Sequence, residues 1–243
     1  MNWKQLISAK RFGMEEFHEE RQENRSEFQR DYDRLIFSAP FRRLQNKTQV
    51  FPLPGSVFVH NRLTHSLEVA SVGRSLGDDV AKALLERHPE LQDSFLPEIG
   101  SIVSAACLAH DLGNPPFGHS GEKAISTFFS EGKGVRLKEK QPNGEQLSPM
   151  EWEDLTHFEG NANAFRILTH QFEGRRKGGF VLTYTTLASI VKYPFSSSLA
   201  GTKSKFGFFV SEEESFQKIA TELGLTLLNE HPLKYARHPL VYL

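Results

Sequence analysis

The sequence predicts an all-α fold, and three observations support that prediction. Apolar residues recur at three- and four-residue spacing over residues 64–88, as they do along one face of a helix. Residues 98–112 are apolar on most faces, which indicates a central buried helix. The sequence contains neither a convincing run of alternating strands nor an internal repeat. Together these patterns favour helices packed on helices around one core.

Composition limits the classes of function. The 243 residues carry 29 basic and 30 acidic side chains, a formal net charge of −1, which excludes a strongly basic nucleic-acid binder but leaves a local patch open. A single cysteine, Cys107, excludes a disulfide framework and a cysteine-rich zinc site. The sequence has no long apolar window and no secretory signal, so we expect a cytoplasmic protein without contact to a membrane.

The first third of the chain is predicted to alternate polar segments with helices. Residues 1–35 are polar and dense in charges of both signs, which is typical of a solvated helical segment. Ser26 is placed to cap a helix through about Ser38, and Pro40 ends or restarts it. A basic stretch over 41–50 leads into a Pro- and Gly-containing loop.

Three further helices are predicted over residues 64–88, 98–112 and 119–130. Gly113 is a natural stop for the second of them. The connection to the third, residues 114–118, contains two prolines and a glycine and reads as a rigid turn.

The remaining chain mixes loops with shorter helices. Residues 131–150 are polar and rich in Lys and Gly, which predicts a surface loop. A helix over 151–171 follows, with Gly160 as a candidate break, and another over 182–192 ends before a proline. Ser211 is expected to cap a last helix, to about Leu223, with acidic residues in its first turn.

Histidines and carboxylates gather where these predicted helices begin and end. His65 lies at the start of one helix, His110 and Asp111 at the end of another, and His119 and Glu122 on one face of a third. Each of them alone is more often a packed or solvated side chain. An ionised Asp at the end of an apolar helix, however, is costly to bury unless it is paired or bound to a metal. Imidazole nitrogens and carboxylate oxygens suit a divalent ion, so the stretch predicts a metal or catalytic site.

Several segments resemble one family in particular. LTHSLEV around His65, HDLGNPPFGHSGE over 110–122 and HFEGNANAFRIL over 157–168 are similar to the deoxyguanosine-triphosphate triphosphohydrolase branch of the HD-domain superfamily. FRRLQNKTQVFPLP, NRLTHS and LTYTTLASIVKYP fit it too, so the resemblance runs from about Asp31 to Leu243. It implies a single HD-type domain over 1–243, with a helical, bundle-like core around a metal site, as the N-terminal part of a longer architecture. It also implies hydrolysis of a dNTP to a deoxynucleoside and inorganic triphosphate.

The resemblance also assigns roles to individual residues. His65, His110 and Asp111 match metal ligands for Mg or Mn, with Fe, Co or Zn as alternatives, and His119 and Glu122 match a catalytic pair. Which member of that pair takes which proton stays open. The positions that match substrate contacts are Arg62 for phosphate, Gln49 for deoxyribose, and Lys192 and Tyr193 for triphosphate and sugar. Arg43 and Lys47 either help to hold the polyanion or are solvated surface charges.

The sequence departs from the family pattern at one metal ligand. The family has a second Asp on a helix that follows an HPL-type segment, whereas this sequence has no Asp after Asp154 and ends at RHPLVYL. We therefore expect a fragment with weakened metal affinity and an exposed apolar face, unstable or aggregating and at best weakly active. The family often forms hexamers, which implies a homo-oligomer, and it includes binders of single-stranded DNA. The basic segments 175–177 and 203–205 are weak candidates for that contact.

Two other functions stay open at this stage. One is an HD phosphohydrolase that acts on a different nucleotide phosphoester, which would release monophosphate, pyrophosphate or a linear dinucleotide. The other is an inactive nucleotide- or nucleic-acid-binding module, which the missing Asp favours and the retained His119 and Glu122 oppose. The sequence does not reveal the base preference.

Overall fold

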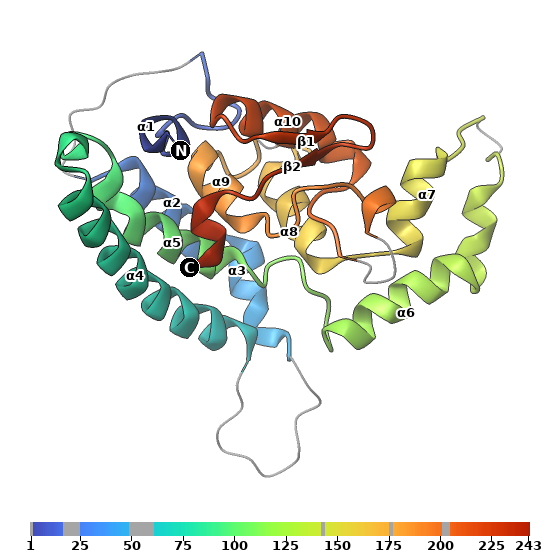
Figure 1. Ribbon diagram of the computed structural model, residues 1–243. Helices are drawn as coiled ribbons and strands as arrows, with labels where there is room; N and C mark the ends of the chain where they lie inside the picture. The colour runs from blue at the N-terminus through green and yellow to red at the C-terminus, as the bar shows by residue number, and fades with distance from the viewer. Residues whose placement is uncertain (1, 17–24, 49–60, 142–143, 175–176, 201–204) are drawn as a thin grey trace, which may run out of the picture.

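Helices make up most of the computed structural model, which describes residues 2–16, 25–48, 61–141, 144–174, 177–200 and 205–243 (Figure 1). The all-α prediction is confirmed, with one addition: β1 (Leu227–Asn229) and β2 (Lys234–Tyr235) form a small antiparallel pair. Among the described residues, no helix combines the length and apolarity needed to span a membrane.

The helices follow the predicted order closely. They are α1 (Trp3–Leu6), α2 (Glu27–Ile36), α3 (Ala39–Arg43), α4 (Arg62–Arg87), α5 (Ile99–Ala109), α6 (His119–Ser130), α7 (Pro149–Thr156), α8 (Gly160–Thr169), α9 (Tyr184–Ile190) and α10 (Glu213–Glu222). Short 3₁₀ turns cover Leu44–Asn46, Pro89–Leu91, Leu96–Glu98, Lys133–Lys138, Ser197–Leu199, Val210–Glu212 and Pro239–Tyr242.

An antiparallel pair, α4 and α5, forms the frame of the molecule. A Cβ on Gly73 would lie 2.6 Å from Cys107 Sγ, and a Cβ on Gly77 would lie 2.7 Å from Gly100 Cα. The helices are therefore so close that only glycine fits at these crossings. Gly73 faces Cys107 near the end of α5, whereas Gly77, further along α4, faces Gly100 near the beginning of α5. The start of α4 therefore lies beside the end of α5.

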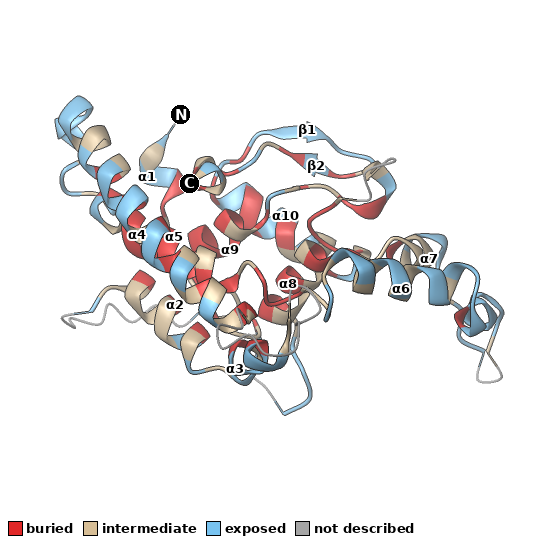
Figure 2. Ribbon diagram, turned by 90° about the horizontal axis from the view of Figure 1, so that it is seen from below, coloured by how far each residue is buried: buried red, intermediate tan, exposed pale blue. Residues whose placement is uncertain are grey.

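The hydrophobic core lies on the other side of α5. This helix is buried along nearly its whole length, as its apolar sequence predicts, and it packs against α2, α4 and α9 (Figure 2). Fully buried Leu108, Phe165, Leu187 and Phe216 join α5 to α8, α9 and α10. Each such side chain contributes about 1.5–3 kcal/mol through removal from water.

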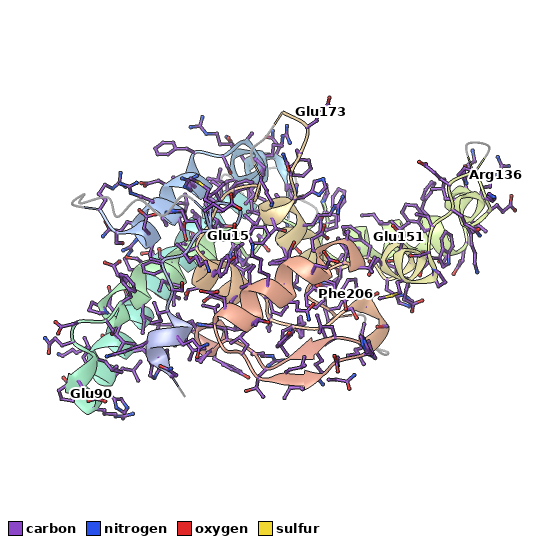
Figure 3. All side chains as sticks on the ribbon, turned by 90° about the horizontal axis from the view of Figure 1, so that it is seen from above. Glu15, Glu90, Arg136, Glu151, Glu173 and Phe206 are labelled. Carbon is purple, nitrogen blue, oxygen red and sulfur yellow. The ribbon has the colours of Figure 1, made fainter. Side chains whose placement is uncertain are left out.

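The segment from α6 to α7 projects from this body as an arm (Figure 1). No residue of α6 is buried, and the labels of Arg136 and Glu151 in Figure 3 mark the far end and the middle of the arm. The surface loop predicted over 131–150 is wrong in part, because residues 133–138 form a 3₁₀ helix. That helix packs on α6, where buried Gly134 lies against Phe128. The other described residues between that helix and the start of α7, 139–141 and 144–148, are not helical.

The prediction of a solvated helical segment over 1–35 is wrong in part, because among the described residues only α1 and α2 are helical and both bury side chains. The α1 helix has four residues, and the chain that follows buries Ile7 and pairs Arg11 with Thr183 in an isolated bridge. The charged side chains of this segment do not form one solvated face, because some of them pair with buried residues. Ser26 does cap α2 as predicted, and its Oγ accepts a hydrogen bond from Gln29 N at 3.2 Å.

The ends of two other predicted helices need comment. The candidate break at Gly160 is confirmed, because α7 ends at Thr156 and α8 begins at Gly160. Ser211 does not cap α10. A 3₁₀ turn precedes that helix, and the Ser211 hydroxyl instead accepts from Arg166 Nη1 and donates to Glu212 Oε1. The Ser211 hydroxyl binds the charged groups nearest to it, and the local sequence does not reveal that Arg166 is one of them.

A buried ion pair fixes the N-terminal segment on the core. Asp31 is fully buried and receives Arg11 Nη1 at 2.7 Å, Thr183 N at 2.9 Å and Thr183 Oγ1 at 2.6 Å. Burial raises the pKa of Asp31 above its ordinary value, against the opposing effects of the Arg11 charge and the Thr183 donors. The pair thus joins the N-terminal segment, α2 and the cap of α9.

We expect Arg11→Ala to lower the free energy of unfolding by about 3 kcal/mol, because it leaves a buried carboxylate without its cation. Arg25→Ala is the matched control. Its partner is Asp33, but the Arg25 side chain is 59% exposed, so the loss should stay below about 1 kcal/mol. Urea unfolding of both variants measures the difference, and equal losses would contradict the assignment.

A second link joins the N-terminal segment to the last turn of the chain. His238 is buried, its Nε2 lies 3.0 Å from Leu6 O, and its Nδ1 accepts from Leu240 N at 3.3 Å. Because a carbonyl only accepts, Nε2 carries the proton and the ring is neutral. Burial lowers the pKa of His238 from 6.5 to about 4.

This histidine should make stability depend on pH. Between pH 6.5 and about 4 the unfolded chain binds the extra proton, so stability is lost as the pH falls through that window. We expect the stability advantage of the wild type over His238→Asn to shrink by about 3 kcal/mol on acidification, measured by urea unfolding. The comparison cancels other titrating groups, which both proteins share. An advantage that is constant with pH would refute the account.

Candidate metal centre and surrounding cavity

Three of the predicted metal ligands meet where α4 begins and α5 ends. His65 lies in the first turns of α4, and His110 and Asp111 directly follow α5. One donor atom from each lies within 4.8 Å of the others, and the two imidazole centroids are 5.3 Å apart. The close approach of the two helices brings together His65 and His110, which are 45 positions apart in the sequence.

The hydrogen bonds of His110 prepare it to bind a cation. Its Nδ1 lies 2.6 Å from Cys107 O, a carbonyl that only accepts, so Nδ1 carries the proton. In the neutral ring Nε2 is then an acceptor, and this atom lies 3.4 Å from Asp111 Oδ1. Two acceptors at this distance repel each other unless a cation lies near both. The donor set therefore fits a divalent metal, with the carbonyl fixing the tautomer.

Asp111 is held from its other side. Its Oδ2 pairs with Arg62 Nη1 at 2.9 Å, and its Oδ1 accepts from Asn114 Nδ2 at 2.5 Å. Both Arg62 and Asp111 are buried, and the Nε of Arg62 has no hydrogen-bond partner among the described residues. The guanidinium therefore retains a donor for a further anion.

A cavity of about 510 Å³ opens beside these residues. It brings together most of the predicted site residues, which are Arg62, His110, Asp111, His119, Glu122, Lys192 and Tyr193. His65 is not among the residues that line the cavity, but its ring lies beside that of His110, and Gln49 lies outside the described residues. Arg43 is exposed at the end of α3. Lys47 donates to Asn114 O at 3.1 Å, and burial followed by the Arg62 charge lowers its pKa.

The two members of the predicted catalytic pair have different surroundings. His119 is exposed at the first position of α6. Glu122 is held through both oxygens: Gly160 N donates to Oε1 at 3.0 Å, and Lys205 Nζ lies 3.5 Å from Oε2. Position 160 requires glycine, because a Cβ would lie 2.1 Å from Asn114 Oδ1 and 2.9 Å from Glu122 Oε1. The start of α8 thus fixes the carboxylate of α6.

The connection between α5 and α6, which the sequence predicts to be a rigid turn, has a strained backbone. Phe117 adopts a φ of 65° and Gly118 a φ of 55°, and a left-handed backbone is uncommon for a bulky residue such as Phe. Phe117 N donates to Thr48 O at 3.3 Å, and its ring lines the cavity. Backbone strain of this kind persists where the surrounding structure enforces it, often at functional sites.

Sequence reasoning missed several residues that line the cavity. Lys205, a member of a weak candidate segment for single-stranded DNA, instead pairs with Glu159 Oε1 at 2.6 Å. Glu159 is only 1% exposed and accepts from Asn161 N at 2.9 Å. Burial acts to lower the pKa of Lys205, but Glu159 and Glu122 raise it overall. The one hint in the sequence that Lys205 lies near the core is the apolar residue that follows it, Phe206, which is buried and is labelled in Figure 3.

The cavity combines two kinds of chemistry. Its lining includes His110 and Asp111 of the His-His-Asp donor set, and it also includes Lys192, Lys205 and the Arg62 guanidinium, which pairs with Asp111. Cations that retain hydrogen-bond donors in a partly enclosed site favour a ligand with several negative charges.

Comparison with known proteins shows which proteins this chain resembles. Residues 62–178 match the HD domain. Proteins named deoxyguanosinetriphosphate triphosphohydrolase-like are 44% identical in Synechocystis and 46% in Pseudomonas aeruginosa, over all of this chain and over 56% and 53% of those proteins. One named deoxyguanosinetriphosphate triphosphohydrolase in Yersinia enterocolitica is 36% identical, over 97% of this chain and 51% of its own length. The chain spans about half the length of these curated relatives. The chain thus contains an HD domain and is similar, over nearly its whole length, to part of the proteins named deoxyguanosinetriphosphate triphosphohydrolase or deoxyguanosinetriphosphate triphosphohydrolase-like.

Proposed function

We propose that this chain carries the active site of a divalent-metal-dependent hydrolase that converts a dNTP, such as dGTP, to a deoxynucleoside and inorganic triphosphate. One observation carries the proposal: His110 and Asp111, two members of a His-His-Asp donor set, line a cavity that is also lined by three cationic side chains. The names of the relatives support the same chemistry. We further propose that residues 1–243 form one HD-type domain.

His65, His110 and Asp111 are the residues that would hold the ion, Mg or Mn first and Fe, Co or Zn as alternatives. A bound ion of this kind polarises a phosphoryl oxygen as a Lewis acid. The second Asp that the resemblance expects has no counterpart after Asp154. Three protein ligands are nevertheless a sufficient set for a catalytic ion whose open positions take water or substrate.

The cations of the cavity would hold the triphosphate. Arg62 keeps donors beyond the one that pairs with Asp111, and a guanidinium matches phosphate oxygens well. Lys192 is exposed at the cavity, and Lys205 would redirect its ammonium from Glu122 and Glu159 toward the phosphates. Tyr193 and Gln49 are proposed to contact the sugar.

Glu122 and His119 would handle the protons. Because Gly160 N fixes the carboxylate of Glu122, it can hold and deprotonate the water that attacks the α-phosphorus. The bond between that phosphorus and the 5′ oxygen breaks, and the exposed His119 gives the 5′ oxygen its proton. The products are a deoxynucleoside and intact triphosphate, which balances the reaction.

We expect His110→Ala and Asp111→Ala each to abolish release of triphosphate, because each removes a donor from the metal site. The assay incubates the protein with each dNTP and Mn or Mg, and separates the products by ion exchange. His88→Ala, which removes an exposed histidine after α4, should keep wild-type activity. Triphosphate from the Asp111→Ala protein would contradict the assignment. Monophosphate or pyrophosphate from the wild type would instead favour another nucleotide phosphoesterase.

We expect Glu122→Gln to lower kcat by about 10²–10⁴-fold, the usual contribution of a general base. Its affinity for Mn, measured by calorimetry, should stay unchanged, because Glu122 is not among the proposed ligands. Glu131→Gln at the end of the same helix is the matched control and should leave both quantities unchanged. A normal kcat in Glu122→Gln would remove Glu122 from the mechanism.

Three expectations extend beyond this site. We propose a homo-oligomer on the basis of the resemblance, and a cytoplasmic location on the basis of the single cysteine and the lack of a long apolar window in the sequence. Binding of single-stranded DNA loses one of its candidate residues, since Lys205 pairs with Glu159 inside the cavity.

A further inference from the structure

We propose that Arg237 is a positioning residue that holds the ring of Tyr193 at the cavity wall and so raises the affinity for the ligand. The inference rests on the proposed function for the nature of that ligand. The guanidinium carbon of Arg237 lies 5.7 Å from the centroid of the Tyr193 ring and 5.7 Å from that of Tyr242. Both distances are within the range of cation–π attraction.

Arg237 acts from outside the site. Tyr193 is among the described residues that line the cavity, and Arg237 is not. Arg237 is exposed and follows β2, more than forty positions after Tyr193 in the sequence. An effect of Arg237 on a ligand in the cavity would therefore pass through the Tyr193 ring.

The main chain around Tyr193 is already fixed. Phe195 N donates to Tyr193 O at 2.7 Å, and Tyr235 N donates to Pro194 O at 2.9 Å. The absence of a side chain at Gly207 lets the backbone approach, since a Cβ there would lie 2.1 Å from Tyr193 O. These contacts set where the side chain begins, but they leave the ring free to rotate about its side-chain torsions.

The described contacts of the ring come from three side chains. Lys192 Nζ lies 5.8 Å from the ring centroid, and the Phe195 ring lies 6.2 Å away at an angle of 67°. Both are close neighbours in sequence, and Lys192 is itself a proposed phosphate ligand. Arg237 is the contact from a distant segment, and it stays in place if Lys192 turns toward a phosphate. A ring fixed in advance loses less rotational freedom when the ligand binds, which favours binding.

The position of the ring can be measured without any ligand. The sequence has five tyrosines, so a protein labelled with 3-fluorotyrosine gives five fluorine NMR signals, and Tyr193→Phe identifies the one from Tyr193. We expect Arg237→Ala to move this signal toward the value of an unfolded chain, and Arg237→Lys to restore most of the shift. Lys234→Ala is the matched control, because its ammonium lies 5.7 Å from the Phe195 ring instead. That variant should leave the Tyr193 signal in place.

Kinetics test the consequence for the ligand. An exposed cation–π contact corresponds to a factor of about two to five, so KM for the dNTP should rise by about that factor in Arg237→Ala with kcat unchanged. Arg237→Lys should restore KM, and Lys234→Ala should not alter it. An unchanged Tyr193 signal, or an unchanged KM beside a displaced signal, overturns the proposal. If the wild type cleaves no dNTP, the proposed function fails, and the NMR signal together with the Kd for a dNTP decides the role of Arg237.

Discussion

The close contact between α4 and α5 is the constraint on which the candidate site depends. The two backbones approach at Gly73, Gly77 and Gly100, where any larger residue would collide with the opposite helix. Because the helices are antiparallel, this contact places the start of α4 beside the end of α5. His65 and His110 then face each other with 5.3 Å between ring centroids. A wider spacing, as larger side chains impose on ordinary helix pairs, would separate the donors of a single ion.

The other half of the site depends on polar contacts. The α6 helix lies on the projecting arm and has no buried residue, so apolar packing contributes little to its position (Figure 2). Glu122 reaches the body through Gly160 N, which needs only an acceptor oxygen, and through Lys205, which favours an anionic one. Buried pairs such as Arg62 with Asp111 and Lys205 with Glu159 add little net stability, because desolvation opposes the attraction. Their consequence is a cavity whose cations are already held in place when a polyanion arrives.

The N-terminal segment and the last turn belong to the same folded body. Arg11 reaches the buried carboxylate of Asp31, and Leu6 receives the hydrogen bond of His238. Both links converge on α9, because Thr183, which caps that helix, also donates to Asp31. Directly after α9 come Lys192 and Tyr193. The wall of the cavity that carries these two residues is therefore tied to segments at opposite ends of the sequence.

The sequence by itself determined the helices whose signals are local. Apolar periodicity and the stop at Gly113 placed the ends of α4, α5 and α6 within about three residues. The resemblance singled out His65, His110 and Asp111 as metal ligands. Tertiary structure alone decided the positions whose partners are distant. Arg11 leaves a helical pattern for buried Asp31, Ser211 turns to Arg166 instead of capping α10, and Lys205 enters the cavity to meet Glu159. In each case a charged or polar side chain binds the strongest partner within reach. Which residue that partner is depends on how the helices pack.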